Sequence, residues 1–592
     1  MSRWFVSGLM LGTMCLSLVA DDPKPADLAK KPQWQRMLAG EDAKTAAKLE
    51  KRIAELEAAD DYGGAIQSAE ELLQLRNRRQ GADHHEVKTA EQDVVALKKV
   101  AALEAKERRT WRQVTSRWRE AEQLRNSAKY AAALTIEKEI LEIRRKVLGE
   151  DHPDTAGSYG VVAFILNAQG KAAEAGPLYQ KALEIRRKVL GEEHPDTASS
   201  YNNVARNLDA QGKAVEAGPL LQKALEIRRK VLGEEHPDTA SSYNNVAFNL
   251  NAQGKAAEAG PLYQKALDIR RKVLGEEHPA TATSYNNVAS NLDDLGKGAE
   301  AGPLYQKALD IHRKVLGENH PDTVTCYNNV AGNQLVLGDI GAATATLTDG
   351  IRAYESSRLV AATGIERGNL TQFNPRLLLA SLMAVQEPRA AWRHLELSLA
   401  RGLFDQQSSA TRLTAAEQRT QLEARQGVAA RQPRILNLVS RGNRSSNENQ
   451  ELHELLNQRR QQEETIARPS VLDSERSVEP GERIQAALPA DAAIVYWLDV
   501  SDSTARVQEH WACVVRNAGE PKWVRLPGTG DKGAWAKTDS ELATALRLAL
   551  QASSDPKEYE KILDQLKSRP ALAQIVKAAA DSPTVMLVRR HG

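Results

Sequence analysis

Apolar residues recur with a helical period through the middle of the chain, in a stretch that returns every 42 residues. In the copy at residues 197–213, the apolar positions i, i+3, i+4 and i+7 are Tyr201, Val204, Ala205 and Leu208. This spacing predicts an α-helix with one apolar face. After Gly212 the pattern resumes on a second predicted helix, with Ala217, Leu220, Leu221, Ala224 and Leu225, which Gly233 ends.

The period is regular enough to define an architecture. A tyrosine marks it at Tyr159, Tyr201, Tyr243, Tyr285 and Tyr327. A histidine followed by proline marks it at His152, His194, His236, His278 and His320. A fixed period between 20 and 50 residues indicates a solenoid, because one helical hairpin cannot bury both of its apolar faces alone. We therefore expect a mainly α protein whose helical hairpins stack into an α-solenoid.

Three motifs in each copy carry a family resemblance. They are G-K-x-x-E-A at residues 212–217, A-L-E-I-R-R-K-V-L-G at 224–233 and H-P-D-T at 236–239. Together they resemble the tetratricopeptide repeats of the kinesin-light-chain type. The usual repeat has about 34 residues, and the longer period here implies longer helices and a longer H-P-D-T loop. The predicted array spans residues 110–357, with a divergent first copy, where Gly160 and Val161 replace an asparagine pair, and a divergent last copy.

The remaining sequence divides into six further segments. They are a signal peptide or anchor (1–20), a linker (21–41), an N-terminal helical region with a degenerate repeat (42–109), a helical extension with a degenerate repeat (358–404), a charged helical linker (405–478) and a small α/β domain (479–592). The charged linker is rich in Arg, Gln and Glu, which predicts an exposed helix pair or a partly ordered connection.

The N-terminus has the pattern of a secretory signal. Arg3 precedes an apolar run from Trp4 to Ala20, and Asp21 follows at once. The run is also just long enough for an uncleaved anchor. We expect export to the periplasm or outside the cell if the signal is cleaved, and otherwise a membrane-anchored or cytoplasmic protein. Contact with a membrane is expected only through this segment, if it is not cleaved.

The C-terminal region changes from helical to strand-like patterns. The predicted strands are 492–500, 510–516, 521–526 and 584–590, and the predicted helices are 538–551, 556–568 and 571–580. Strands, then helices, then a strand predict the first half of an α/β sheet. The stretches ERIQAALPADAAIVYWLDV and EHWACVVRNAGEPKWVRLPG resemble the start of a CHAT domain, the caspase-like domain commonly attached to tetratricopeptide arrays.

The resemblance to a CHAT domain raises the question of catalysis. Active members use a Cys–His dyad, and by the layout of the family both residues lie beyond residue 592. His510 and Cys513 do not replace the dyad, because positions i and i+3 of one strand lie on opposite faces, about 10 Å apart. Cys513 is expected to be a core residue, and His591 has no scaffold beyond it. We expect an incomplete or decayed CHAT-like domain and no catalytic residue.

Composition narrows the classes of partner and cofactor. Lys+Arg 80 against Asp+Glu 78 leaves a net charge of +2, which argues against nucleic acid as a partner. The basic runs such as residues 186–188 are expected to be neutralised by nearby acids. Three cysteines in 592 residues exclude a disulfide framework, and Cys326 and Cys513 are expected to be free thiols. Repeated histidines on helices about 8–10 Å apart do not meet at one zinc ion, whose ligands lie at about 2 Å, so no metal and no small-molecule cofactor is expected.

The candidate binding residues lie on the first helix of each hairpin. Amides can hold the backbone of an extended peptide, and the second asparagine of each pair is the predicted contact: Asn203, Asn245, Asn287 and Asn329. The same amides can instead cap or cross-link neighbouring helices. Five positions after each tyrosine the copies differ, as Phe164, Arg206, Phe248, Ser290 and Gly332, and of these Arg206 and Phe248 are further candidates.

These residues predict a non-enzymatic scaffold that binds a peptide or protein partner in the concave groove of the solenoid. The alternative is a caspase-like cysteine peptidase whose catalytic half is missing from this chain. A third hypothesis is a rigid spacer without a specific ligand.

Overall fold

The fold is known from a computed structural model. The residues that it describes are 31–126, 130–360, 375–384, 386–395, 415–439, 441, 444–476, 485–488, 492–500, 509–527 and 584–591. The chain forms two compact units, the first ending at Val273 and the second beginning at Leu274. The boundary falls inside helix α12 (Ala256–Leu274), within the repeat array.

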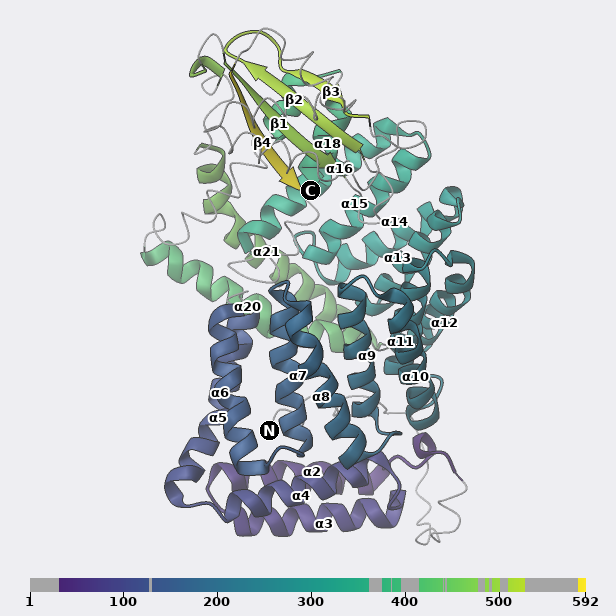
Figure 1. The fold of residues 1–592 in the computed structure, drawn as a ribbon, viewed down its shortest axis with the longest axis vertical. Helices are drawn as coiled ribbons and strands as arrows, with labels where there is room; N and C mark the ends of the chain where they lie inside the picture. Colours follow the sequence, from purple (N-terminus) through teal and green to yellow (C-terminus); the bar gives the residue numbers. More distant parts are fainter. Residues whose placement is uncertain are drawn as a thin grey trace, which may run out of the picture. The chain divides into compact units, whose positions relative to one another are not determined.

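Nearly all elements are helices (Figure 1). The first unit contains η1 (Gln33–Gln35), α2 (Gly40–Ala58), α3 (Tyr62–Gln80), α4 (His85–Ala101), α5 (Ala105–Asn126), α6 (Tyr130–Leu148), α7 (Pro153–Ala168), α8 (Ala172–Leu190), α9 (Pro195–Ala210), α10 (Ala214–Leu232) and α11 (Pro237–Ala252). The second contains α13 (Pro279–Asp294), α14 (Gly298–Val315), α15 (Pro321–Val336), α16 (Ile340–Val360), α18 (Pro375–Met383), α20 (Ala415–Val439), α21 (Ser446–Arg476) and strands β1 (Ala492–Val500), β2 (Glu509–Arg516), β3 (Lys522–Arg525) and β4 (Thr584–His591). The predicted mainly α solenoid with a small C-terminal sheet is confirmed.

The ends of the hairpin helices follow from local chemistry. Helix α8 ends at Gly191, whose φ of 90° is a conformation that side-chain-bearing residues rarely adopt. Helix α9 begins with proline at its first position, and the Nδ1 atom of His194 accepts a hydrogen bond from the Asp196 amide (3.1 Å). The Thr197 hydroxyl donates to the Gly191 carbonyl (2.8 Å) and closes the turn. The histidine is therefore an N-cap, which is the turn-packing role that the sequence predicts.

Neighbouring hairpins share apolar clusters. In the first unit, Ala205 of α9 and Leu221 of α10 lie in the same apolar cluster as Tyr243 of α11 and Ile269 of α12. The buried alanines allow the helix backbones to approach closely, and the tyrosine rings fill the space between hairpins. Stacking of hairpins thus buries the second apolar face, as the repeat pattern predicts.

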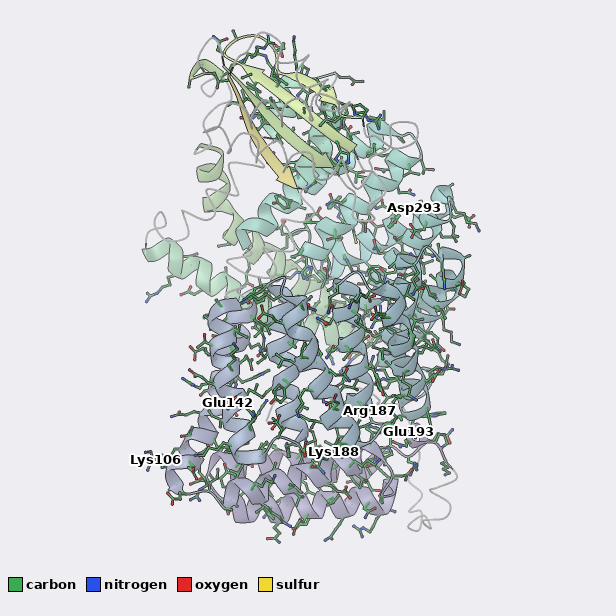
Figure 2. The ribbon with its side chains drawn as sticks, in the orientation of Figure 1. Lys106, Glu142, Arg187, Lys188, Glu193 and Asp293 are labelled. Carbon is green, nitrogen blue, oxygen red and sulfur yellow. The ribbon has the colours of Figure 1, made fainter. Side chains whose placement is uncertain are left out.

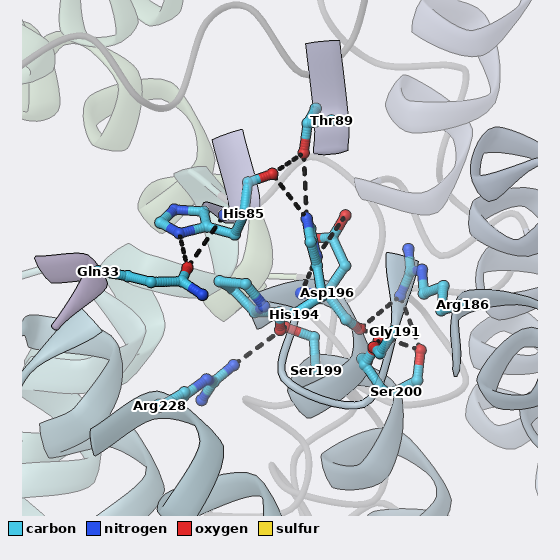
Figure 3. A network of polar contacts seen from close by, with 12 residues as sticks. Gln33, His85, Thr89, Arg186, Gly191, His194, Asp196, Ser199, Ser200 and Arg228 are labelled. Atoms are coloured by element: carbon cyan, nitrogen blue, oxygen red, sulfur yellow. Dashed lines mark hydrogen bonds and ion pairs between the residues drawn. The ribbon is translucent and has the colours of Figure 1, made fainter. Parts of the chain in front are cut away.

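An N-terminal arm, defined as η1 and helices α2 to α4, lies across the histidine turns of the first unit (Figures 1 and 3). Since Nδ1 of His194 accepts the capping bond, its Nε2 carries the proton and contacts the His85 carbonyl (3.2 Å) and the Thr89 hydroxyl (3.1 Å). The Trp34 ring lies against Gly233, 3.1 Å from where a Cβ atom would stand. The arm therefore covers the edge of the array that the histidine turns form.

In the second unit, helices α20 and α21 cover the same kind of edge. The Arg459 side chain, only 3% exposed, donates to the Val315 carbonyl at the end of α14. Arg444 forms an ion pair with Glu277 (3.2 Å). The predicted helix pair is present as α20 and α21, but it is not wholly exposed, because Ile435 of α20 is fully buried.

The C-terminal strands form one mixed sheet with the order β3-β2-β1-β4. β1 pairs antiparallel with β2 and parallel with β4, and Tyr496 lies opposite Cys513. These two side chains pack in one core with Ile351 of α16 and Leu379 of α18. The four predicted strands are thus present, and Cys513 is a fully buried core residue as expected.

Several predictions fall outside the described residues. They concern the signal or anchor at 1–20, residues 21–30 of the linker, parts of the extension at 358–404, and the helices predicted at 538–551, 556–568 and 571–580. Across the described ranges, no helix combines the length and the apolar character needed to cross a bilayer.

Candidate functional site

The basic runs, such as the one that contains Arg187 and Lys188 (labelled in Figure 2), are neutralised by acids of the array. The Glu192 carboxylate accepts a hydrogen bond from the Tyr201 hydroxyl (2.7 Å) and forms an ion pair with Arg187 (2.8 Å). Lys188 pairs with Asp151 of the preceding turn (2.5 Å). Burial and the neighbouring Glu192 raise the pKa of Tyr201 to about 12, so the tyrosine remains a donor at neutral pH. The same contacts recur in other copies, so the basic runs bind the turns of the array itself.

The repeated histidines serve the turns and are not gathered at one point. His152, His194, His236, His278 and His320 each cap a separate helix through the ring nitrogen Nδ1. Among the residues that the structure describes, no group of three His, Cys, Asp or Glu side chains is arranged to hold a metal ion.

The capping histidines predict that acid destabilises the array. Burial lowers the pKa of His236 and His320, so the folded chain keeps them neutral. The unfolded chain takes up protons below its ordinary pKa of about 6.5, and stability is lost as the pH falls through that value. We expect the Tm to fall by about 3 °C or more between pH 7 and pH 5. Thermal unfolding followed by circular dichroism measures this change.

A matched variant separates the histidines from other acid-sensitive groups. Asparagine is also a strong N-cap but does not titrate in this range, so H236N/H320N is expected to lose less stability than the natural chain. Equal losses in both chains would contradict the prediction.

A third asparagine, which is not among the predicted contact residues, joins neighbouring hairpins. The Nδ2 atom of Asn249 donates to Asp209 (2.9 Å) and to the Ala214 carbonyl (2.9 Å) of the preceding hairpin. Its Oδ1 accepts from Gln253 (2.7 Å), and the residue is only 2% exposed. Gly218 permits this approach, since an added Cβ atom would stand 3.1 Å from Oδ1 of Asn249. The sequence signal was available, because Asn207, Asn249, Asn291 and Asn333 recur with the period.

The predicted contact residues in the asparagine pairs are used differently from one copy to another. Asn245 donates to Asn202 of the preceding copy (2.7 Å), and in the second unit Asn329 donates to Asn286 (2.6 Å). These bonds match the cross-linking alternative. Asn329 is in addition only 6% exposed, whereas Asn287 is half-buried.

Asn203 differs from these amides. The equivalent bond of Asn245 is accepted by Asn202, 43 residues earlier. The residue 43 positions before Asn203 is Gly160, which has no side chain to accept a hydrogen bond. A Cβ atom added to Gly160 would meet nothing within 4 Å, so the space beside it is open. Within the described part of the chain, the half-buried Asn203 makes no hydrogen bond through its side chain. The divergent first copy therefore leaves one amide of the series available.

The variable positions next to Asn203 are exposed in the first unit. Phe164 and Phe248 expose 42% and 61% of their surface, on helices α7 and α11. Arg206 lies between them in the series, on α9, and is also exposed. It has no ion pair or hydrogen bond with any residue that the structure describes. In the second unit the equivalent Ser290 is half-buried and Gly332 is buried, so exposure at this position is a property of the first three copies.

A buried histidine and cysteine meet in the second unit. His312 Nδ1 lies 3.5 Å from Cys326 Sγ, and each residue is 3% exposed. In other copies an arginine and a serine occupy these positions, and Arg228 donates to Ser242 (2.9 Å). Burial raises the pKa of the Cys326 thiol, as does the nearby Asp322. The pair is thus a packed replacement of Arg–Ser, and both Cys326 and Cys513 are free buried thiols as expected.

Comparison with family models identifies the repeats. One model described as tetratricopeptide repeat matches residues 156–230, 208–259 and 238–301, and a second matches residues 124–154 and 281–322. The segment from 124 to 322 is therefore an array of tetratricopeptide repeats, a class of scaffold that generally binds protein partners. Neither model reaches residues 479–592, so the resemblance of that region to a CHAT domain stays a prediction.

Solved structures contain similar repeats. Nearly identical TPR-like repeats assigned to a kinesin light chain of Podosopora anserina are 28% identical, covering 35% of this chain and 98% of that chain, with a TM-score of 0.32. BtubC (BKLC) from P. vanneervenii is 22% identical, with coverage of 41% and 89% and a TM-score of 0.32. The apo form of RapI is 15% identical, with coverage of 52% and 98% and a TM-score of 0.34. No curated protein sequence matches the chain. The repeat assignment rests on the family models and on the helical hairpins.

Proposed function

We propose that the first unit binds an extended segment of a partner protein along helices α7, α9 and α11. The observation that carries this proposal is the available amide of Asn203 beside the open space at Gly160. A side-chain amide offers both a donor and an acceptor, which suits the backbone of an extended peptide.

The exposed side chains near Asn203 indicate which chemical groups the bound partner segment carries. Phe164 and Phe248 provide apolar contact area on either side of Asn203, and aromatic side chains often dominate binding energy. Arg206 provides an unpaired guanidinium group, which favours a carboxylate or backbone carbonyl on the partner. We therefore expect a segment with two apolar side chains around an acceptor group.

The same geometry favours binding over a spacer without a ligand. A spacer has no use for an amide without a hydrogen bond, an exposed guanidinium group without an ion pair and two exposed aromatic rings. In the third copy, the amide of Asn245 donates to Asn202 and is therefore not available to a ligand. The contrast between Asn203 and Asn245 supports a site centred on the second copy.

The proposal is tested by a variant in which Asn203 is given the hydrogen-bond acceptor that Asn245 has in the next copy. G160N is expected to supply the missing acceptor, engage Asn203 and fill the open space, and so to weaken peptide binding about tenfold without loss of stability. The ligand is a peptide selected from a phage-displayed random library on the full chain. Fluorescence anisotropy measures its binding, and chemical denaturation checks the fold.

Two further variants complete the experiment. V161N adds an asparagine at the adjacent position of the same copy and is expected to bind as the natural chain does. The triple variant F164A/R206A/F248A is expected to lose binding while its circular dichroism is unchanged. Unchanged binding in both G160N and the triple variant would overturn the proposed site, and failure to select any peptide would support the spacer hypothesis.

For residues 479–592 we propose membership of a CHAT-like fold without a catalytic role in this chain. The mixed sheet, with β1 parallel to β4 across a long connection, supports an α/β fold of this kind. Cys513 is fully buried in that sheet, and a buried thiol is a poor nucleophile. The function proposed for the chain is therefore that of a scaffold.

A further inference from the structure

The second unit exposes aliphatic side chains at the turns between the two helices of a hairpin. Val336, Leu337 and Ile340 expose 55%, 53% and 57% of their surface, and Leu295 of the preceding hairpin exposes 39%. Leu337 reaches that hairpin, since its Cδ2 atom lies 3.4 Å from where a Cβ atom of Gly298 would stand. We call Leu295, Val336, Leu337 and Ile340 the turn patch.

The turn patch is a departure from the rest of the array. Three earlier copies have a glutamine where this unit has Leu295 and Leu337, namely Gln169, Gln211 and Gln253. Gln211 and Gln253 donate to the Ala172 and Ala214 carbonyls of the preceding hairpin (3.4 and 3.3 Å), so the glutamine helps to join the hairpins. Replacement of that bonded amide by an exposed leucine in two successive copies is not explained by packing within the described residues.

The charge at the same two turns has also changed. Alanine occupies positions 168, 210 and 252, whereas the fourth copy has Asp294. Lysine occupies positions 171, 213, 255 and 297, whereas the last copy has Asp339. Asp293, labelled in Figure 2, lies at the same end of α13. It accepts a hydrogen bond from Asn333 (2.8 Å) and corresponds to Asp209 of the second copy, so it is not part of the change. The turn patch is thus flanked by two exposed carboxylates, Asp294 and Asp339, against one lysine, Lys297.

We propose that the turn patch binds a basic amphipathic helix of a partner protein. A helix presents aliphatic side chains at the spacing of one or two turns, and flanking lysines place their ammonium groups over a carboxylate rim. The exposed aliphatic side chains and the two carboxylates occur at the same turns, so the surface is complementary to both the apolar face and the lysines of such a helix. This surface is separate from the proposed peptide site, because it consists only of residues of the second unit.

The test uses the full chain and two synthetic amphipathic helices. One carries Leu and Lys, the other Leu and Glu, at identical positions, and each has a fluorescein label. Anisotropy titration is expected to show binding of the Leu/Lys helix only. L295Q/L337Q, which restores the residue of the earlier copies, is expected to weaken that binding about tenfold. D294A, which also restores an array residue, is expected to weaken it about threefold and to reduce its dependence on salt.

A matched control shows whether any exposed aliphatic residue has the same effect. Val215 is 75% exposed and belongs to the first unit, not to the turn patch, so V215Q is expected to leave binding unchanged. Equal binding of the Leu/Glu helix, or unchanged binding in L295Q/L337Q, would overturn the proposal. Sedimentation of the free chain gives one more outcome: a dimer that L295Q/L337Q dissociates would show that a second copy covers the turn patch, and would also overturn it.

Discussion

Replacing Asn249 with alanine is expected to lower the free energy of unfolding by about 2 kcal/mol. The side chain is almost fully buried and donates to Asp209 and Ala214 while it accepts from Gln253. Its removal leaves polar groups without a partner at the interface between two hairpins, and it opens a small cavity there. Urea denaturation followed by circular dichroism measures the loss.

Asn245 supplies the matched control, four residues away on the same helix. It is half-buried and makes one hydrogen bond, to Asn202. Alanine at this position is therefore expected to cost less than about 1 kcal/mol. If both variants lose the same amount of stability, the third asparagine of each repeat has no special role in joining the hairpins.

The second large effect is expected at the buried pair of the second unit. H312R alone is expected to lower stability by about 3 kcal/mol, because it places a guanidinium group against a thiol that offers only a weak acceptor. In the first unit the equivalent Arg228 has the Ser242 hydroxyl and the Asp238 carbonyl as acceptors. Chemical denaturation of the full chain measures the change.

The double variant H312R/C326S restores the combination of the other repeats. It is expected to recover at least about 1 kcal/mol of the loss, since residues in contact usually show coupling energies of about 0.5–3 kcal/mol. C326S alone is expected to have a small effect. Strictly additive losses in the cycle would mean that the two replacements are energetically independent, and that His312 and Cys326 do not form a unit.

Both predictions concern polar groups inside a repeat array, and both bear on function. Where the array bonds its asparagines to each other, those amides are not available to a partner, as at Asn245 and Asn329. Where the preceding copy lacks the acceptor, as at Gly160, the amide of the following copy, Asn203, is available to a ligand. Binding sites in such an array are therefore expected at departures from the repeat, because each departure breaks a contact that the identical copies satisfy among themselves.

The departures themselves are visible in the sequence, but their consequences are not. Gly160 and Arg206 both stood out as variable positions in the series. Which amide lacks a partner depends on a contact between residues 43 apart, as in Asn245 with Asn202. The four asparagines predicted as peptide contacts look alike in sequence but differ in these inter-repeat bonds and in burial.

By itself, the sequence determined the hairpins, their ends and the strands of the C-terminal sheet. These features rest on local interactions, such as the contact between His194 and the Asp196 amide, and on the period of the apolar positions. The tertiary structure alone decided that the N-terminal arm covers the histidine turns, and that α21 holds the end of α14 through Arg459. Those contacts join residues more than 100 positions apart, and no periodic pattern specifies them. They arise because exposed carbonyls and apolar faces at the edges of the array are stabilised by whichever flanking helix can reach them.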